Sequence, residues 1–384
     1  MLYTTKVRVL MISSGLDKKF GGPPEAVTGA ACGLSNLGID VTVAVFGQTQ
    51  KSWNESHFPK YLESNSVRTV LFPAKSTSRY GGKIRFNEIR ILWNEIKSTD
   101  FVTLHQVYNY QNVIATFMMR IFRRKFALMP HGTMTSYQSS KHLVRKFLMK
   151  PIFVGGIVSK ADRIFVATQI ERDEIPHKWK HKTSIVGLGF SAPQRKVIGT
   201  RPNNDHFTFI FVGRLAQKKR IDITLQALKL ASDISGKTIK LIICGTGDNR
   251  IVDLISEYAK SKGKFQIEYK GWIGGEMKEL ELNRADCFIL TSEDENFAIA
   301  VAEGLSFGLP CLISSKVALS ELINKHEAGI VFDELNTELI ANEAIRMMDS
   351  NLTLLSENAL IASKELSWNV VSKIWLQEIN QVVS

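Results

Sequence analysis

The sequence has few cysteines and no long hydrophobic run. Its four cysteines, Cys32, Cys244, Cys287 and Cys311, show no paired spacing, and their apolar contexts predict buried reduced thiols instead of disulfides or a metal site. No stretch of 18 or more residues is both apolar and uncharged, so no membrane-spanning helix is expected. The N-terminal segment lacks the long apolar region and cleavage site of a signal peptide and is interpreted as a first strand. These absences predict a cytoplasmic protein.

Acidic residues are also missing from positions 101–161, although the whole chain has 37 of them. The same stretch holds nine basic residues: Arg120, Arg123, Arg124, Lys125, Lys141, Arg145, Lys146, Lys150 and Lys160. Such a field favours nucleic acid, an anionic membrane surface or a phosphorylated substrate, and a solvated basic face is the alternative. Nucleic acid is disfavoured, because Phe122 and Phe126 fit a buried helix face and a strand and no nucleic-acid motif occurs.

What the sequence does contain is a regular alternation of apolar strand-like runs and helical patterns, which predicts parallel sheets with helices on both faces. The expected strands are 6–12, 41–45, 100–104, 126–130, 161–167, 207–212, 239–244, 265–269, 287–290, 310–314 and 329–332. One polar segment with two prolines, 191–206, interrupts the alternation and is interpreted as a linker. The prediction is an α/β protein with Rossmann-like domains at 1–190 and 207–366 and a final helix at 367–384.

Doubly wound sheets bind ligands at the carboxyl ends of their strands, and the clearest candidate there is a pair of glutamates. Glu295 lies just before a helix that is predicted to begin near Phe297 or Ala298, and Glu303 lies inside it, within an otherwise apolar pattern. Eight residues of helix would separate the two carboxylates by about 12 Å, which matches the reach from a hexose across a diphosphate to a ribose. The free amides of the helix N-terminus suit the diphosphate. A carboxylate on so apolar a helix needs a partner.

A second candidate follows the strand at 207–212. Gly213 and Arg214 come directly after it, and Lys218 and Lys219 follow a short turn. Two cations at the end of a strand can neutralise a diphosphate leaving group, with Arg as a planar fork and Lys as a point charge. A solvated basic turn is the alternative.

Further strand-end loops carry weaker signals. His131 ends a strand and precedes a glycine, although a core histidine is a serious rival interpretation. The remaining candidates are the glycines Gly21, Gly22, Gly245 and Gly247, and Trp272. Gly21 and Gly22 permit close backbone approach to a phosphate. Gly245 and Gly247 lie in a further strand-end loop of the second half, and Trp272 either shelters a base or packs in the core. No GxGxxG fingerprint is present.

Taken in order, these motifs resemble the retaining glycosyltransferases of family 4, which have the GT-B fold of two facing Rossmann-like domains. The resemblance covers nearly the whole chain: Gly21-Gly22, Pro130-His131-Gly132, Ala161-Asp162 leading to Glu171, Gly213–Lys219, Gly245–Gly247, Gly271-Trp272, and the paired Glu295 and Glu303. The C-terminal helix after Ser367-Trp368 resembles the family helix that returns to the first domain.

The resemblance implies a role for each candidate residue. Glu303 would hold the donor ribose, Glu295 the sugar hydroxyls, and Arg214 with Lys219 the diphosphate. Amides of Asn296, Phe297, Ala298 and Gly22 would surround the phosphates and sugar, and His131 would lie beside the anomeric carbon. The family needs neither metal nor cofactor, and the expectation here is the same.

Two positions depart from the family pattern. Ala298 stands where the family usually has glycine, and if that position needs a positive φ, alanine costs about 1 kcal/mol or more. Gly187-Leu188-Gly189 replaces an asparagine-glycine turn before the linker. Neither change removes a charged group.

The expected chemistry is transfer of a glycosyl group, with retention, from a nucleoside diphosphate sugar to an acceptor hydroxyl. The acid-free stretch lies in the domain that binds the acceptor in this family, which favours a lipid-linked or growing glycan at an anionic membrane surface, in surface polysaccharide assembly. A small soluble acceptor remains an alternative, as does a sugar-nucleotide epimerase of the same fold.

Overall fold

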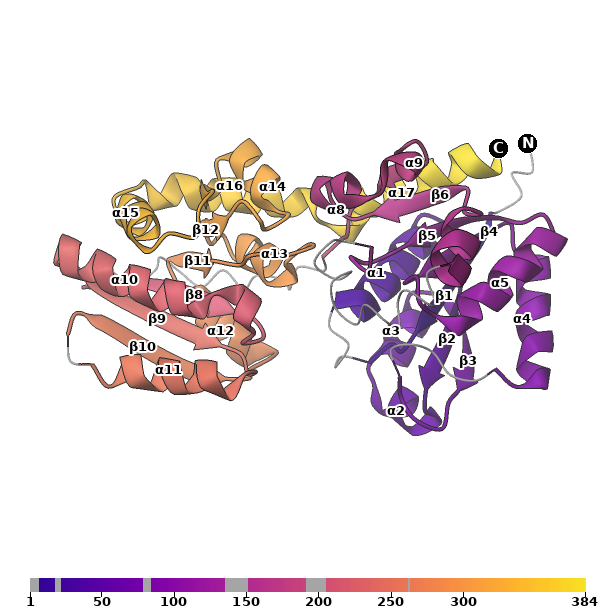
Figure 1. Cartoon of the computed structure of the whole chain (residues 1–384), viewed down its shortest axis with the longest axis horizontal. Coiled ribbons are helices and arrows are strands. Elements are labelled where there is room, and N and C mark those ends of the chain that lie inside the picture. The colour runs from indigo at the N-terminus through magenta and orange to yellow at the C-terminus, as the bar shows by residue number, and fades with distance from the viewer. Residues whose placement is uncertain (1–6, 18–21, 79–83, 135–150, 191–204, 262) are drawn as a thin grey trace. The chain divides into compact units, whose positions relative to one another are not determined.

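The computed structural model describes residues 7–17, 22–78, 84–134, 151–190, 205–261 and 263–384. The chain divides into two compact units: unit 1 is Met1–Ser191 with Ser367–Ser384, and unit 2 is Ala192–Leu366. Figure 1 shows a parallel sheet with helices in each unit. The predicted linker lies almost wholly outside the described residues.

Unit 1 is built on a sheet of seven parallel strands in the order β3-β2-β1-β4-β5-β6-β7. The strands are β1 Arg8–Ser14, β2 Asp40–Gln48, β3 Arg68–Pro73, β4 Phe101–His105, β5 Lys125–Met129, β6 Arg163–Val166 and β7 Thr183–Ile185. The helical elements are α1 Gly22–Asn36, α2 Gln50–Glu55, α3 Phe58–Ser64, α4 Phe86–Ser98, α5 Tyr110–Ile121, η2 Pro151–Val158, α8 Gln169–Glu174, α9 His177–Lys180 and α17 Trp368–Val383. The strand order reverses between β1 and β4, which makes their carboxyl ends the expected ligand position.

Unit 2 repeats this plan with six parallel strands in the order β10-β9-β8-β11-β12-β13. The strands are β8 His206–Val212, β9 Thr238–Cys244, β10 Phe265–Gly271, β11 Cys287–Leu290, β12 Cys311–Ser314 and β13 Gly329–Phe332. The helices are η3 Gln217–Lys219, α10 Ile221–Ser235, α11 Asn249–Ala259, α12 Glu276–Arg284, α13 Ile299–Ser306, α14 Ser320–His326, α15 Thr337–Met348 and α16 Leu352–Glu365. The order reverses between β8 and β11.

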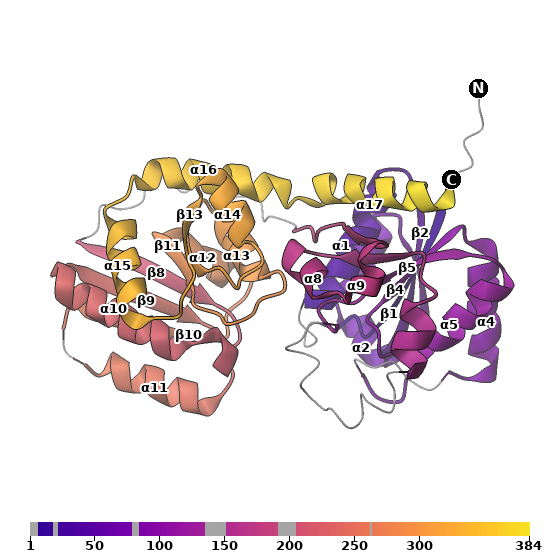
Figure 2. The same cartoon turned by 45° about the horizontal axis from the view of Figure 1, so that its top comes forward.

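The C-terminal helix α17 packs on α1 within unit 1, as Figures 1 and 2 show. Two glycines allow the close approach: a Cβ on Gly29 would lie 2.1 Å from the Trp368 ring, and one on Gly33 would lie 1.9 Å from the Ser372 hydroxyl. Gly189 likewise has the Trp368 ring 2.3 Å from where its Cβ would be. The Gly187–Gly189 segment, which departs from the family pattern, therefore makes room for this helix, and the predicted return of the C-terminal helix is confirmed.

The two-sheet α/β fold that the alternation predicts is confirmed, and all four cysteines are free and buried. Two strands, β3 and β7, were not predicted. Both lie at edges of the unit 1 sheet, where only one neighbour is needed and a strand can be short or half-exposed. Among the described residues, no helix is long and apolar enough to cross a membrane.

Candidate active site

The predicted diphosphate and sugar residues of unit 2 converge where its strand order reverses. Arg214 and Lys219 follow β8, while Glu295 follows β11, and β8 and β11 are hydrogen-bonded neighbours. Both loops leave the carboxyl ends of parallel strands, which is where open α/β sheets bind their ligands. The sequence thus placed these residues at a common edge correctly, and the structure adds their contacts.

Three cations in the loop after β8 pair with three acids in the loop after β11. Lys218 pairs with Asp294 at 3.4 Å, Lys219 with Glu295 at 2.6 Å and Arg220 with Glu293 at 3.0 Å. Lys218 also reaches the same Glu295 oxygen at 3.2 Å. Each acid of this cluster therefore pairs with a cation of the protein, and these ion pairs hold the two loops together.

Lys219 and Glu295 are the most enclosed pair of the three. Their side chains are 13% and 12% exposed, so each charge depends on the other for compensation. Burial lowers the pKa of Lys219, and Glu295 partly opposes that shift. Burial alone would raise the pKa of Glu295, but Lys219 and Lys218 outweigh it and lower the pKa. Each member of the pair thus favours the charged form of the other: Glu295 raises the pKa of Lys219, and Lys219 lowers the pKa of Glu295.

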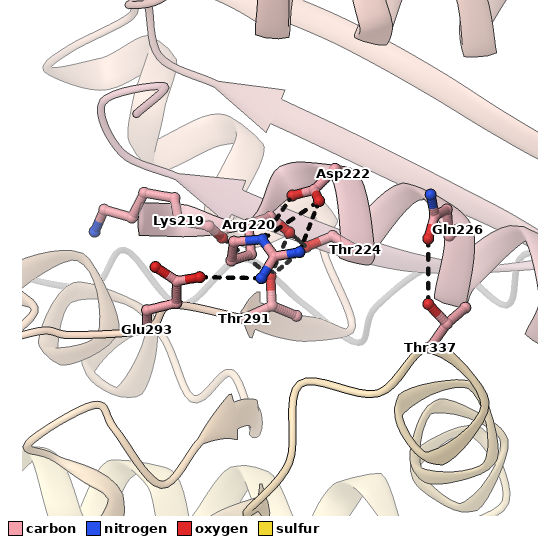
Figure 3. Close-up of polar contacts among 8 residues, drawn as sticks. All are labelled: Lys219, Arg220, Asp222, Thr224, Gln226, Thr291, Glu293 and Thr337. Carbon is pink, nitrogen blue, oxygen red and sulfur yellow. Dashed lines mark hydrogen bonds and ion pairs between the residues drawn. The ribbon is translucent and has the colours of Figure 1, made fainter. Parts of the chain in front are cut away.

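Side-chain hydrogen bonds hold the turn that presents Lys219. Thr291, the first residue after β11, donates to the carbonyls of Lys219 and Arg220 at 3.1 and 2.9 Å and contacts the Thr224 hydroxyl at 2.7 Å. Arg220 takes a left-handed backbone, with φ +48°, and its guanidinium reaches both Asp222 and Glu293. Figure 3 shows these contacts around Arg220. The Lys219 ammonium is consequently held by a rigid turn.

The glycines after β9 support the Arg214 turn directly. A Cβ on Gly245 would lie 1.8 Å from the Gly213 carbonyl oxygen, and one on Gly247 would lie 1.9 Å from that of Leu215. Hydrogen bonds join the same segments, from the Gly213 amide to Cys244 and from the Leu215 amide to Thr246, both at 2.9 Å. These glycines make room for the neighbouring loop, and their predicted part in donor binding stays a prediction. Arg214 itself is exposed.

The helix α13 begins at Ile299, slightly later than predicted, with Ala298 at its N-cap. Ala298 has φ +62°, so the position does require the left-handed backbone that the missing glycine suggested. Between the glutamates, Asn296 is half-buried and Phe297 is buried. Residues 295–298 precede the helix. The predicted separation of Glu295 and Glu303 assumed a helix over the whole interval, and that assumption holds only for its second part.

Glu303 has a partner that the sequence did not reveal. Lys278, on α12, forms an ion pair with it, and the two side chains are 26% and 16% exposed. The apolar helix therefore carries a compensated carboxylate, as its burial requires. Trp272, in the loop before α12, is 76% exposed. It does not pack in the core, and its ring lies against Gly274.

Ala298 provides a stability test of this loop. We expect Ala298→Gly to raise the free energy of unfolding by about 1 kcal/mol, because glycine adopts a positive φ without the Cβ clash. The control is Ala302→Gly in the middle of the same helix, where the same change should lower stability. Chemical denaturation measures both. A loss of stability in Ala298→Gly would contradict the assigned backbone strain.

In unit 1, His131 forms a chain of polar contacts with a second histidine, which is buried. Its Nε2 lies 2.9 Å from Nδ1 of His105, the last residue of β4, and Nε2 of His105 lies 3.1 Å from the Thr103 hydroxyl. Burial lowers the pKa of His131 to about 4. It lowers that of His105 well below the usual range, with His131 adding to the effect. Both rings are neutral near pH 7, so only one of the two facing nitrogens carries the shared proton, and the tautomer of His105 is coupled to that of His131.

Glu171 holds the loop that carries His131. One carboxylate oxygen accepts from the Gly132 amide at 2.7 Å and the other from the Ala167 amide at 2.8 Å. His131 and Gly132 both have positive φ, at +52° and +72°. A fully buried carboxylate thus stabilises two consecutive left-handed residues. The other predicted loop is described only in part: Gly21 lies outside the described residues, and Gly22 begins α1, directly before two prolines that lack amides.

The low pKa of His131 predicts a pH dependence of stability. In the unfolded chain the ring titrates near 6.5, but in the folded protein near 4. Between these values the unfolded state binds more protons, so stability is complete above the window and is lost as the pH falls through it. We expect His131→Asn to flatten this slope in denaturation curves. The same change at His177, which is exposed, is the control, and an unchanged slope in His131→Asn would contradict the assignment.

Comparison with known proteins identifies the second unit. Residues 195–363 match the family described as glycosyl transferases group 1. They form a group 1 glycosyltransferase domain. The cation–carboxylate cluster, Glu303 and the α13 N-terminus all lie inside the matched segment of this domain.

Curated relatives are similar over part of their length. An uncharacterized glycosyltransferase of Methanocaldococcus jannaschii is 28% identical over 38% of this chain and 36% of its own length. An Escherichia coli UDP-Gal:alpha-D-GlcNAc-diphosphoundecaprenol alpha-1,3-galactosyltransferase is 25% identical over 43% of this chain and 42% of its own. The matches thus span less than half of these relatives.

Solved structures resemble the whole chain in fold. The Anabaena protein HepE, in complex with UDP and glucose, superposes with a TM-score of 0.69 over 98% of this chain and all of its own, at 14% identity. At such identity the likeness establishes the fold alone. Together with the group 1 domain it shows that the chain has the GT-B fold, with two Rossmann-like domains.

Proposed function

We propose that this protein is a retaining, metal-independent glycosyltransferase that moves a hexosyl group from a nucleoside diphosphate sugar to an acceptor hydroxyl. One observation carries the proposal: within a group 1 glycosyltransferase domain, the enclosed Lys219–Glu295 pair lies where the strand order reverses. That arrangement offers positive charge and a sugar-binding carboxylate at the expected ligand position. Donor binding is assigned to residues 207–366, and acceptor binding to residues 1–190 with the helix 367–384.

The donor is assigned to unit 2 group by group. Arg214 and Lys219 bind the diphosphate, with amides at the start of α13, and Glu303 binds the ribose hydroxyls. Glu295 binds the sugar hydroxyls. Lys218 and Lys219 both contact its Oε1 oxygen, which leaves Oε2 for the sugar. Trp272 is exposed enough to stack on the nucleotide base.

The same charges account for the chemistry. As the bond to the anomeric carbon breaks, negative charge develops on the diphosphate, and cations already held in place stabilise it without reorganisation. Glu295 is a weak base because the lysines lower its pKa, which disfavours it as a nucleophile. The acceptor oxygen bonds to the anomeric carbon on the face that the diphosphate leaves, which retains the configuration, and the leaving phosphate accepts the hydroxyl proton. Glu293, Asp294 and Glu295 are each paired with a cation, so protein charges take the place of a metal ion.

The acceptor is assigned to unit 1. His131 acts there as a neutral imidazole, oriented by His105, that donates or accepts a hydrogen bond. The acid-free stretch 101–161 and the relative named for a diphosphoundecaprenol substrate support a lipid-linked or growing glycan in surface polysaccharide synthesis. The enzyme then works at the cytoplasmic face of a membrane.

A panel of nucleoside diphosphate sugars tests this function. We expect one donor to release its nucleoside diphosphate, faster when a polyprenyl-diphosphate-linked sugar is added, with a product of retained anomeric configuration by NMR. A faster reaction with a soluble sugar would reassign the acceptor. Interconversion of donor sugars without nucleotide release would identify an epimerase and overturn the proposal.

A further inference from the structure

The helix α5 exposes an apolar face. Tyr110, Phe117 and Ile121 are 53%, 67% and 49% exposed. At about 100° per residue these three positions fall within about 40° of one another on the helix surface. They form one stripe along the helix, called here the α5 stripe, and Val113 and Ile114 beside it are half-buried.

Such a stripe is unusual on a helix that also packs on a core. The opposite face of α5 is already buried, with Ala115, Met118 and Met119 in the core of unit 1. The outward face of a helix in this position is normally polar. A continuous exposed apolar surface of this kind marks an interaction site.

The surroundings of the stripe are basic. Arg120 and Arg123 are exposed beside it, and Arg90 and Lys97 are exposed on α4, which packs against α5 (Figure 1). Within the described part of the chain, none of these four cations forms an ion pair. The three acids between positions 86 and 125 are all engaged by arginines, in the pairs Arg85–Glu88, Arg68–Glu95 and Arg8–Asp100. The field around the stripe is thus positive and uncompensated.

We propose that the α5 stripe is the surface that docks this protein on an anionic membrane. A helix with apolar residues on one face and flanking arginines lies in the plane of the lipid interface, with its apolar side chains among the acyl chains and its cations at the headgroups. Aromatic residues such as Tyr110 and Phe117 suit that boundary. Charge complementarity selects an anionic lipid surface as the occupant.

A second copy of the chain fits this surface less well. A twofold interface would place the same patch on both subunits, and would gather Arg120 and Arg123 of both copies around one contact area. Four like charges would then meet around an apolar strip with no acid to offset them. Lipid phosphates supply the missing negative charge.

The docking surface also deepens the proposed function, on which its biological use depends. Tyr110 begins α5 only five residues after His105, which contacts His131 at the carboxyl edge of the unit 1 sheet. A membrane bound along α5 therefore reaches the edge of the sheet to which the acceptor is assigned. A lipid-linked acceptor would be presented there without leaving its bilayer.

Vesicle flotation of the full chain tests the surface without donor or acceptor. We expect binding to vesicles of phosphatidylcholine with phosphatidylglycerol, release at raised salt, and no binding to phosphatidylcholine alone. Phe117→Glu/Ile121→Glu should weaken binding at least about tenfold, and Arg120→Glu/Arg123→Glu by a similar factor. The control is Leu354→Glu/Ile361→Glu on α16, whose side chains are 50% and 49% exposed and should not affect binding.

Circular dichroism checks that each variant is folded, and sedimentation velocity checks its mass. The proposal is overturned if the wild-type chain fails to bind anionic vesicles at low salt, or if the α5 variants bind as the wild type does. It is also overturned if the chain is a dimer that Phe117→Glu/Ile121→Glu dissociates, since the stripe would then be a subunit interface. Vesicle binding by a chain that turns over no sugar nucleotide would contradict the proposed function and leave the docking surface standing.

Discussion

Lys219→Ala is expected to lower turnover by about 100- to 1000-fold, the effect of removing one preorganised electrostatic stabiliser. Lys219 is enclosed, its ammonium is 2.6 Å from Glu295, and the turn that carries it is fixed by Thr291. Its charge is therefore in place before the diphosphate becomes more negative. Arg214→Ala should have an effect of the same order, because the two cations share the developing charge. Steady-state nucleotide release measures both.

The control for Lys219→Ala is Lys229→Ala in the same unit, whose ion pair with Asp233 is on the surface of α10. It should leave turnover within about twofold, since exposed pairs contribute little. A double-mutant cycle of Lys219→Ala with Glu295→Gln separates loss of phosphate charge from loss of Glu295 positioning. Excess EDTA should leave the wild-type rate unchanged. A rate abolished by EDTA and restored by a divalent cation would refute metal independence.

Glu303→Ala should weaken donor binding by about 10- to 100-fold, the range expected for losing hydrogen bonds to a charged group. The side chain is 16% exposed and faces Lys278. Without Glu303 the Lys278 ammonium can be hydrated by water, so we expect the variant to fold. Calorimetric titration with two ligands tests the ribose role: the nucleoside diphosphate, and inorganic diphosphate, which has no ribose. The variant should lose affinity for the nucleoside diphosphate and keep its affinity for inorganic diphosphate.

The partner of Glu303 supplies the matched variant. Lys278→Ala removes the same ion pair from the other side, so a purely structural role predicts equal losses for Lys278→Ala and Glu303→Ala. We expect the lysine variant to bind nucleotide within a fewfold of the wild type. Unchanged nucleotide affinity in a folded Glu303→Ala protein would show that the glutamate does not hold the ribose.

The sequence predicted the strand ends well because parallel strands bring their carboxyl ends to one edge. Arg214, Lys219 and Glu295 could be placed together on that basis. For Ala298 the family resemblance raised a positive φ only as a condition, and the structure shows that the condition is met. The edge strands β3 and β7 were missed because an edge position needs less apolar pattern. Lys278 was missed because no local periodicity connects α12 with α13.

His105 was overlooked although a signal for it exists. It ends β4, His131 follows β5, and these strands are neighbours in the sheet, so two histidines at adjacent strand ends could be expected to meet. For Gly245 and Gly247 the sequence carried a signal but did not show what lies next to them. A glycine pattern indicates close approach, but only the fold shows that the approaching group is the backbone of Gly213 and Leu215.

A crystal structure of the full chain with the nucleoside diphosphate that it binds tests the proposed donor site most directly. We expect a diphosphate within about 3 Å of the Arg214 and Lys219 side chains and of amides at the start of α13. We also expect the ribose hydroxyls to lie on Glu303. A nucleotide bound with its phosphates away from both cations, or with its ribose away from Glu303, would contradict the proposed donor site.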